Sequence, residues 1–128
     1  MGMSIGRIAV GQLEVNCYIV SDDATKEAMV IDPGDEPDRI LDYVTEKGLM
    51  LVKIVCTHTH FDHIGALPEL KESLKVSIAM HKDEVVIYKR AKEMAAVWGF
   101  QIDDMPAPDV LLTDGDEVVV GGLKFKVL

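Results

Sequence analysis

The chain has 128 residues, of which 48% are hydrophobic and 27% are charged, and its formal net charge is -9. This length suits one domain with a modest core, and the composition is that of a globular protein rather than a disordered one. The negative charge argues against a nucleic-acid backbone or an anionic membrane as the main partner. We therefore expect residues 1–128 to form a single domain that binds neither.

The location of the protein can also be predicted from the sequence. No apolar run approaches the ~20 residues that span a bilayer, and the N-terminus lacks the features of a secretory signal. Cys17 and Cys56 lie in runs that are typical of buried strands. A disulfide between them is compatible with the sequence, but we favour two buried free thiols in a reducing compartment. We expect a cytoplasmic protein.

The first third of the chain predicts three strands and a helix. Turn residues separate the strands, and Asp32-Pro33-Gly34 ends the last of them. The helix that follows has Asp35 as its expected cap, Pro37 in its first turn and Gly48 at its end. The expected strands cover residues 5–10, 15–21 and 27–31.

Strands and helices alternate in the middle of the chain. Residues 51–56 form an almost continuous apolar run, which suits a strand covered on both faces. Apolar residues on one side predict a helix that opens near His63, and residues 76–80 predict a short strand. A further helix is expected over residues 83–98, with an apolar cluster in the core that comprises Met94, Val97 and Trp98.

The last third of the chain predicts a loop and a hairpin. Residues 100–108 contain two prolines and no periodicity, and their apolar side chains could line a groove or pack on the core (Phe100, Ile102 and Met105). Strands are expected at residues 117–120 and 123–128, joined by Gly121-Gly122. The order of elements predicts an α/β chain with at least one mixed sheet and helices packed against it.

A histidine-rich segment, Thr57-His58-Thr59-His60-Phe61-Asp62-His63, follows the strand at residues 51–56. In an extended segment residues i and i+2 point to the same side, so His58 and His60 can bind one metal together. Asp62 and His63 lie where the strand gives way to a helix, and the turn can direct both toward the same pocket. The alternative is a solvated loop, but three of the four histidines would then share six positions by accident. We favour a metal site.

The ligand types in this segment indicate hydrolytic chemistry. Imidazole and carboxylate groups bind zinc at about 2.0–2.2 Å, and they also accept iron or manganese. Such a site lowers the pKa of bound water from 15.7 to about 7, which gives a metal-bound hydroxide nucleophile at neutral pH. Asp62 could bind a metal, orient the hydroxide or accept a proton from it, so it is the candidate catalytic residue.

The sequence His58-x-His60-x-Asp62-His63, placed between an apolar strand and a helix, resembles the signature of the metallo-β-lactamase superfamily. Three other stretches agree, namely Asn16-Cys17-Tyr18-Ile19-Val20, Ile31-Asp32-Pro33-Gly34 and Asp114-Gly115-Asp116. The combination is most similar to the glyoxalase II-like (hydroxyacylglutathione hydrolase-like) branch and covers essentially the whole chain. This resemblance implies the N-terminal part of an αββα sandwich, in which two sheets lie between outer helices.

The resemblance also implies roles for individual residues. His58 and His60 match ligands of a first zinc ion, and Asp62 and His63 match ligands of a second. Asp32 would lie near the site, although it could equally serve as the first residue of an Asp-Pro-Gly turn. The implied function is a metal-dependent hydrolase that acts on a small-molecule thioester, such as hydroxyacyl-glutathione, or on a related ester or lactone.

The sequence departs from the family pattern beyond the strand expected at residues 123–128. The family has another histidine beyond this strand, then a metal-bridging aspartate and a final histidine, and this chain contains none of the three. His81 precedes the helix expected from residue 83 and should be a surface or capping residue instead. We therefore expect a C-terminally truncated domain with two protein ligands for each metal and a reduced affinity. Its uncovered sheet edge would favour a homodimer or a swapped assembly.

Two other functions fit the same residues. One is an iron-dependent oxygenase of the persulfide dioxygenase type, which shares this motif. The other is a non-catalytic metal-binding or interaction module, which the absent ligands favour. Metal analysis distinguishes the oxygenase from the hydrolase, and zinc binding without turnover would identify the module.

Overall fold

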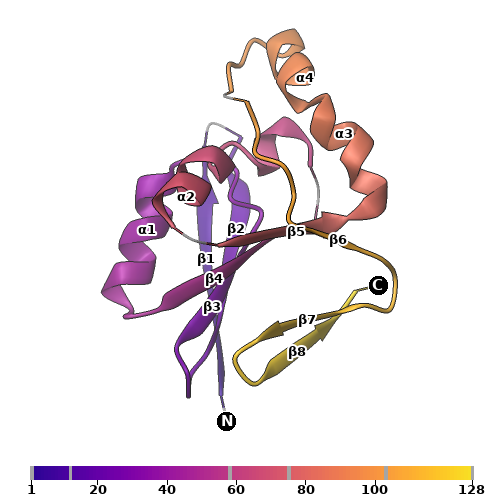
Figure 1. The fold of residues 1–128 in the computed structure, drawn as a ribbon. Helices are drawn as coiled ribbons and strands as arrows, with labels where there is room; N and C mark the ends of the chain where they lie inside the picture. Colours follow the sequence, from indigo (N-terminus) through magenta and orange to yellow (C-terminus); the bar gives the residue numbers. More distant parts are fainter. Residues whose placement is uncertain (1, 12, 58, 75, 103, 128) are drawn as a thin grey trace.

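A large mixed sheet carries helices on one face and a hairpin on the other (Figure 1). This computed structural model describes residues 2–11, 13–57, 59–74, 76–102 and 104–127, except for the side chain of Phe61. The α/β class and the mixed sheet confirm the expectation from the sequence. The architecture also agrees with the helix, sheet, sheet order that begins the expected sandwich.

The large sheet has six strands in the order β1-β2-β3-β4-β5-β6. The first three strands pair antiparallel, and the strands from β3 to β6 pair parallel. Because parallel strands share one carboxyl edge, the segments that follow β3, β4 and β5 lie at the same end of the sheet. The strands are β1 (Met3–Val10), β2 (Val15–Asp22), β3 (Glu27–Ile31), β4 (Met50–Cys56), β5 (Ser77–His81) and β6 (Val110–Leu112).

The helices connect the parallel strands or follow them. Two short 3₁₀ helices also follow strands: η1 (Phe61–His63) follows β4 after residues 57–60, and η2 (Lys82–Glu84) follows β5 directly. The α-helices are α1 (Pro37–Glu46), α2 (Leu67–Ser73), α3 (Val85–Lys89) and α4 (Ala91–Val97).

Side-chain alternation divides the buried residues between the two faces of the sheet. Ile54 and Ile78 face the helices, where they join what we call the helix-side core, together with Ile40 of α1 and Leu70 of α2. Each of these four side chains is fully buried, which stabilises the fold by about 1.5–3 kcal/mol apiece. Strands buried on both faces account for the continuous apolar run of β4.

The opposite face packs on an antiparallel hairpin formed by β7 (Glu117–Val120) and β8 (Leu123–Lys126). We call this second cluster the hairpin-side core. It contains Val20, Met29, Ala79, Leu112, Val118 and Val120, with Ile31, Val52, Val55, Phe125 and Val127 packed at its margin. It is the smaller of the two clusters, because one short hairpin covers a six-stranded sheet.

Polar contacts tie this hairpin to the large sheet. The buried carboxylate of Asp22 accepts hydrogen bonds from the backbone N–H groups of Gly122, at 2.6 Å, and Ala24, at 2.9 Å. These donors hold the pKa of Asp22 below its usual value. The Lys53 ammonium group donates to the carbonyl oxygen of Val119 at 2.6 Å. The hairpin is therefore attached at its turn and along β7.

Several local predictions from the sequence are wrong. The single helix expected over residues 83–98 is η2, α3 and α4, interrupted at Arg90 (φ -101°, ψ 2°). The helix expected near His63 begins at Leu67, after η1. Strand β6 lies where no strand was expected. Trp98 is 69% exposed, and its cluster neighbours Met94 and Val97 are exposed as well, so that cluster is not core.

The start of α1 also differs from the expectation. Glu36, with φ 52°, occupies the N-cap position, and no side chain caps the helix there. Asp35 instead accepts a hydrogen bond from the Glu36 N–H at 2.8 Å. Pro37 stands in the first turn, as expected, since its missing N–H has no partner to lose at that position.

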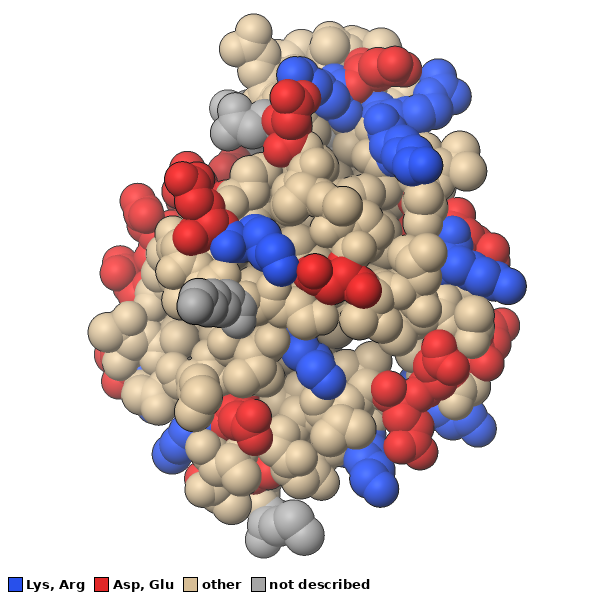
Figure 2. Space-filling model, in the orientation of Figure 1, with Lys and Arg blue, Asp and Glu red and all other residues tan. Residues whose placement is uncertain are grey.

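The surface carries both signs of charge. On the face drawn in Figure 2, Lys and Arg side chains are interspersed with Asp and Glu side chains. Among the residues that the structure describes, no helix combines the length and the apolar character needed to cross a membrane.

Candidate metal centre

The histidine-rich segment packs tightly against the loop between β3 and α1. The N–H of Ala66 donates to the Pro33 carbonyl oxygen at 3.0 Å. A Cβ atom on Gly34 would lie 2.1 Å from the Asp62 carbonyl oxygen, and one on Gly65 would lie 2.3 Å from the Gly34 carbonyl oxygen. Both positions therefore require glycine. Their close contact fixes the backbone on which Asp62 and His63 stand.

Asp32 anchors the first residue of this segment. Its carboxylate accepts hydrogen bonds from the Thr57 N–H, at 2.7 Å, and from the Thr57 hydroxyl group. Asp32 is buried and has a φ of 55°, a left-handed conformation that costs energy for a residue with a Cβ atom. The surrounding hydrogen bonds hold this conformation, which turns the carboxylate toward the segment after β4.

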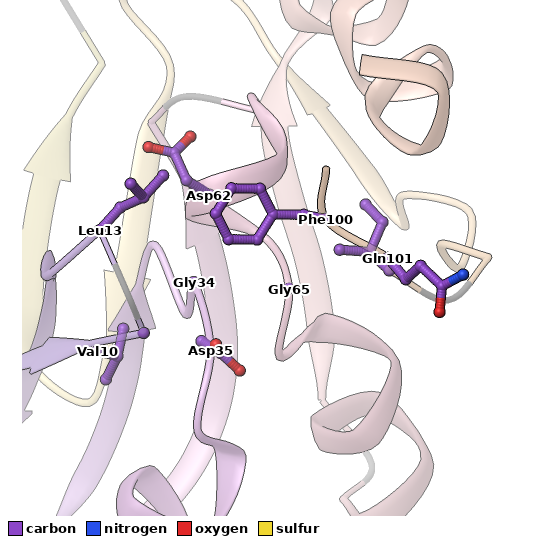
Figure 3. A pocket seen from close by; sticks show the side chains of 10 residues that line it. Val10, Leu13, Gly34, Asp35, Asp62, Gly65, Phe100 and Gln101 are labelled. Carbon is purple, nitrogen blue, oxygen red and sulfur yellow. The ribbon is translucent and has the colours of Figure 1, made fainter. Parts of the chain in front are cut away.

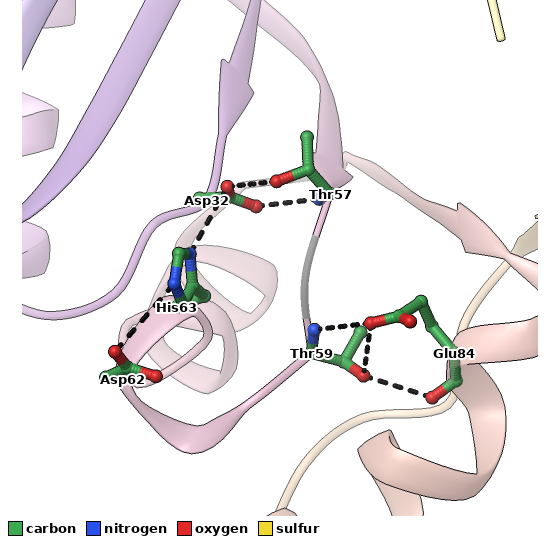
Figure 4. A network of polar contacts seen from close by, with 6 residues as sticks. All are labelled: Asp32, Thr57, Thr59, Asp62, His63 and Glu84. Carbon is green, nitrogen blue, oxygen red and sulfur yellow. Dashed lines mark hydrogen bonds and ion pairs between the residues drawn. The ribbon is translucent and has the colours of Figure 1, made fainter. Parts of the chain in front are cut away.

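His63 lies between two carboxylates (Figure 4). Its Nδ1 atom is 3.3 Å from Asp32 Oδ2, and its Nε2 atom is 3.8 Å from Asp62 Oδ2. A carboxylate beside Nδ1 favours the tautomer with the proton on that nitrogen, which leaves the Nε2 lone pair for a metal. Asp32 thus contacts a residue of the predicted site. Its role is therefore not limited to that of the first residue in an Asp-Pro-Gly turn.

The donor atoms of Asp62 and His63 fit one divalent ion. Two ligands at about 2.1 Å in tetrahedral geometry are separated by roughly 3.4 Å, which is close to the 3.8 Å observed here. Both side chains are about a quarter exposed, so an ion could reach them from solvent. Within the described ranges, however, no group of three or more His, Cys, Asp or Glu side chains is arranged to hold a metal.

Thr59 and His60 point in different directions. Thr59 is fully buried. Its N–H donates to Glu84 Oε1 at 2.9 Å, and its hydroxyl group donates to the Glu84 carbonyl oxygen at 3.0 Å. His60 has an extended backbone and an exposed side chain. Because neighbouring side chains alternate in an extended segment, the burial of Thr59 directs His60 away from Glu84. Figure 4 shows Thr59 turned toward Glu84 and away from His63.

The pairing of His58 with His60 rests on the sequence alone. His58 lies outside the residues that the structure describes. The structure therefore brings together Asp62 and His63 of the four predicted ligands, and the common site of all four stays a prediction.

The two cysteines are free and buried, as favoured from the sequence. Burial raises the pKa of the Cys17 thiol to about 12, with a further contribution from the negative charge of Asp32. Burial likewise raises the pKa of the Cys56 thiol, with contributions from Asp32 and Glu84. Neither thiol is a candidate nucleophile or metal ligand, because both roles require a thiolate.

His81 serves as a cap, which confirms the expectation from the sequence. Its Nδ1 atom accepts a hydrogen bond from the Asp83 N–H at 3.1 Å at the start of η2. Its Nε2 atom lies 2.9 Å from Asp114 Oδ1 in the loop between β6 and β7. His81 therefore connects β5 to the approach to the hairpin.

A pocket of about 170 Å³ adjoins Asp62 (Figure 3). Phe100 and Ile102 line it, which agrees with one of the two roles considered for these residues. Ile102 and Met105 pack on the helix-side core, which is the other role, so Ile102 fulfils both. Sequence reasoning missed the part that Gly34 and Gly65 take in the pocket, as well as the roles of Thr57, Thr59 and Glu84. The glycines at positions 34 and 65 were the available signal for a close approach of two loops.

Comparison with known proteins identifies relatives over almost the whole chain. Residues 10–128 match the sequence model of the Metallo-beta-lactamase superfamily. "Probable metallo-hydrolase YqgX" of Bacillus subtilis is 34% identical, over 95% of this chain and 57% of its own length. "Hydroxyacylglutathione hydrolase GloC" of Haemophilus influenzae is 31% identical, over 98% of this chain and 60% of its own length. The chain thus spans less than two thirds of these relatives.

Solved structures give the same result. TTHA1623 in a di-iron-bound form superimposes with a TM-score of 0.81 at 34% identity, over 88% of this chain and 56% of that one. ETHE1 from Myxococcus xanthus superimposes with a TM-score of 0.70 at 27% identity, over 96% of this chain and 46% of that one. The fold and the order of its elements are therefore shared with these proteins.

Proposed function

This chain belongs to the metallo-beta-lactamase superfamily, and from this we propose that it is the metal-binding part of a metal-dependent hydrolase. The observation that carries the proposal is the position of His63, with Nδ1 beside Asp32 and Nε2 beside Asp62. An imidazole that ligates a metal usually donates its other N–H to a carboxylate or a carbonyl oxygen.

Two pairs of residues would hold the metals. Asp62 and His63 would hold one ion through Oδ2 and Nε2, and His58 and His60 would hold the other. Neutral imidazole and carboxylate suit zinc, and we propose zinc ions in both positions. Asp32 would orient the His63 ring, and the Thr59–Glu84 contact would direct His60 toward solvent rather than toward the core.

The catalytic role falls to Asp62. A bound divalent ion would lower the pKa of a coordinated water, and so would supply a nucleophile near neutral pH. The Asp62 carboxylate would orient that water and accept its proton, since it faces both His63 and the pocket beside the segment. The glycines at positions 34 and 65 would keep the Asp62 backbone in place during this step.

The proposed substrate is a small thioester or a related ester or lactone. This proposal is supported by the relatives whose names describe hydroxyacylglutathione hydrolases. The test is a zinc titration followed by a thioester hydrolysis assay, with Asp62→Asn as the variant that keeps the side-chain shape. Zinc-dependent turnover that Asp62→Asn abolishes is the expected result. Zinc binding without turnover would instead support a non-catalytic metal-binding module.

Iron is the second candidate metal. TTHA1623, which shares this fold at 34% identity, was solved in a di-iron-bound form. An iron-dependent oxygenase would then be the alternative function. Metal analysis of protein purified without added metal distinguishes the two, because iron with oxygen consumption would contradict hydrolysis and zinc would support it.

We further propose a cytoplasmic homodimer or swapped assembly. The location is supported by the two buried free thiols, since reducing compartments keep cysteine unpaired. The assembly is supported by exposed apolar residues on both edge strands of the large sheet, Met3 and Ile5 on β1 and Val110 and Leu111 on β6. Sedimentation equilibrium at micromolar concentration tests this proposal, and a well-folded monomer would contradict it.

A further inference from the structure

Strand β1 forms one edge of the large sheet. Within the described part of the chain it has eight residues and a strand on one side only, because β2 is its single neighbour. It contains neither proline nor lysine, the residues that commonly keep a sheet edge from pairing with another chain. The opposite edge strand, β6, has only three residues and follows Pro106 and Pro108. β1 is therefore the edge better suited to accept another strand.

The backbone groups on the outer side of β1 belong to its odd-numbered residues. Gly2 and Asp23 continue the register of β1 with β2, and the Asp23 N–H donates to the Gly2 carbonyl oxygen at 3.0 Å. Because bonded and non-bonded pairs alternate along an antiparallel ladder, the even-numbered residues of β1 bond to β2. The N–H and C=O groups that point away from β2 are therefore those of Met3, Ile5, Arg7 and Ala9.

One end of this outer side is already occupied by residues at the start of α1. Arg39 Nη1 donates to the Ala9 carbonyl oxygen at 2.8 Å, and the Gly11 N–H donates to Glu36 Oε2 at 2.9 Å. Arg39 and Glu36 also form an ion pair at 3.1 Å. The Gly11 N–H, followed by Arg39, holds the pKa of Glu36 below its usual value. This ion pair, which we call the edge stop, blocks a second strand from Ala9 onward and leaves residues 3–7 open.

The edge stop limits how a second copy of β1 can pair with the first. Two identical antiparallel strands pair about a twofold axis, and the open residues 3–7 place that axis at Ile5. Ile5 then faces Ile5 of the second copy, and Met3 faces Arg7. An axis shifted to Gly6 or Arg7 would bring Met3 or Ile5 opposite Ala9, whose carbonyl oxygen already accepts from Arg39. An axis shifted the other way would pair fewer residues.

The side chains at this register suit an interface between two copies. Met3 and Ile5 are 48% and 59% exposed although both are apolar, and the second copy would cover them. Arg7 is the one charged residue of β1, and it would face Met3 rather than another arginine, so like charges are not opposed. On the helix side Ser4 would face Gly6, and neither residue is bulky.

We propose that residues 3–7 of β1 pair antiparallel with the same residues of a second copy, about an axis at Ile5. The edge stop fixes this register. The inference deepens the homodimer proposed above by naming its surface, and a swapped or β6-mediated assembly would contradict it. Val10, which lines the pocket beside Asp62, lies five residues along β1 from Ile5, or about 17 Å. The interface therefore leaves the pocket open, and it forms whether or not the chain is a hydrolase.

Sedimentation equilibrium of the 128-residue chain at micromolar concentration tests which surface is used. Ile5→Lys should raise the dissociation constant of the dimer by about tenfold or more, because two lysines would face each other across the axis. Val86→Lys, at an apolar position on α3 that is 70% exposed, and Val110→Lys, on β6, are the controls and should leave the constant unchanged. Circular dichroism checks that each variant is folded. A monomeric wild type, an unchanged constant in Ile5→Lys or a loss of the dimer in Val110→Lys would overturn the proposal.

Cross-linking with oxidised glutathione tests the register. The native thiols, Cys17 and Cys56, are buried, so a new surface thiol reacts without competition. Ile5→Cys should form an intermolecular disulfide, since the facing Cα atoms would lie about 5.5 Å apart, within the range that a disulfide needs. Arg7→Cys should not, because its two thiols would be separated by about 14 Å. Cross-linking through Arg7→Cys, or none through Ile5→Cys, would overturn the register.

Removal of the edge stop completes the test. Arg39→Ala frees the Ala9 carbonyl oxygen, so the strands can slide toward Ala9 and Arg7→Cys should now cross-link in this background. Lys47→Ala, at an exposed position that follows α1, is the matched control and should leave Arg7→Cys without a cross-link. An Arg7→Cys thiol that stays free after Arg39→Ala would show that the edge stop does not fix the register.

Discussion

The two faces of the large sheet differ in how completely they are covered. The helix-side core consists of side chains from five strands and all four α-helices, and its largest members are fully buried. The hairpin-side core is smaller, and a cavity of about 560 Å³ remains beside it. Apolar residues such as Met29, Val55 and Phe125 line this cavity.

This difference shows which part of the molecule supports the candidate site. Asp62 and His63 stand on backbone that packs against the loop before α1, which continues into the helix-side core. Thr57 and Glu84, in contrast, border the cavity beside the hairpin. The helix side therefore buries the larger apolar cluster, and the hairpin is held by the smaller apolar cluster together with a few polar contacts.

Truncation of a matched pair of isoleucines tests this difference most strongly. Ile54 of β4 is fully buried on the helix side, whereas Ile31 of β3 is partly buried on the hairpin side. Ile54→Ala should lower the free energy of unfolding by about 3–5 kcal/mol, and Ile31→Ala by less than about 2 kcal/mol. Urea denaturation measures both. Equal losses would contradict the unequal packing of the two faces.

Thr59→Val removes one hydroxyl group while it keeps the side-chain volume. Because Thr59 is fully buried, the Glu84 carbonyl oxygen would lose its donor, at a cost of about 1–3 kcal/mol in unfolding free energy. Thr113→Val, at an exposed position, is the control and should stay within about 0.5 kcal/mol of the wild type. A neutral effect of Thr59→Val would show that this contact does not hold the segment.

Asp22→Asn tests the attachment of the hairpin and should depend on pH. The pKa of Asp22 is lower in the folded state because Gly122 and Ala24 donate to the carboxylate. Its stabilising effect is therefore fully present above the unfolded value of about 3.9 and is lost as the pH falls through the folded value. Asp22→Asn should therefore be less stable than the wild type at pH 7. The difference in unfolding free energy between the two proteins should become smaller as the pH falls.

Urea denaturation at several pH values measures the gap between Asp22→Asn and the wild type. Asp42→Asn, at an exposed position in α1, is the control and should show no such pH dependence. A gap for Asp22→Asn that widens toward acid would contradict the assigned role of the Asp22 carboxylate.

Lys71→Met should have the smallest effect. The Lys71 ammonium group lies 2.8 Å from Asp109 Oδ2, and the side chains are 32% and 42% exposed. Lys71, followed by the Ile78 N–H, lowers the pKa of Asp109. Solvent screening limits the loss in unfolding free energy to under about 1 kcal/mol, and the loss should shrink in about 1 M salt. A loss that does not change with salt would show that it comes from the hydrogen bond that Lys71 also donates to the Val76 carbonyl oxygen, rather than from the ion pair.

The sheet and its faces were largely predictable from the sequence, because apolar periodicity reflects burial directly. The alternating and continuous runs placed five of the six strands of the large sheet and the hairpin. Strand β6 was not predicted, because it has only three residues, which are too few to show an alternation of apolar and polar side chains. The helices were harder. Pro68 in the first turn of α2 and Gly65 before it move the helix start away from His63.

The sequence alone suggests candidate metal ligands, but it does not suggest the contacts that hold them. The spacing of His58, His60, Asp62 and His63 indicates a metal site without any structure. Asp32 was placed near it by resemblance, and the structure adds its contact with His63. The Thr59–Glu84 contact joins residues 25 positions apart, so no local pattern could reveal it. The exposure of Trp98 was also unpredictable, since a short helix offers one buried stripe and the rest of its apolar residues face solvent.

Zinc affinity across single variants tests the central claim most directly. The protein has four histidines, and three of them are proposed ligands. Equilibrium dialysis with metal analysis should show zinc bound by the wild type and by His81→Ala, the control histidine that caps η2. Asp32→Asn, which removes the charge beside His63, should weaken binding by about 10–100-fold.

His58→Ala, His60→Ala, Asp62→Ala and His63→Ala should weaken zinc binding more than Asp32→Asn does, because each removes a direct ligand. The account predicts this order, with His81→Ala indistinguishable from the wild type. Equal losses in His81→Ala and His63→Ala, or zinc binding that Asp62→Ala and His63→Ala leave unchanged, would contradict it.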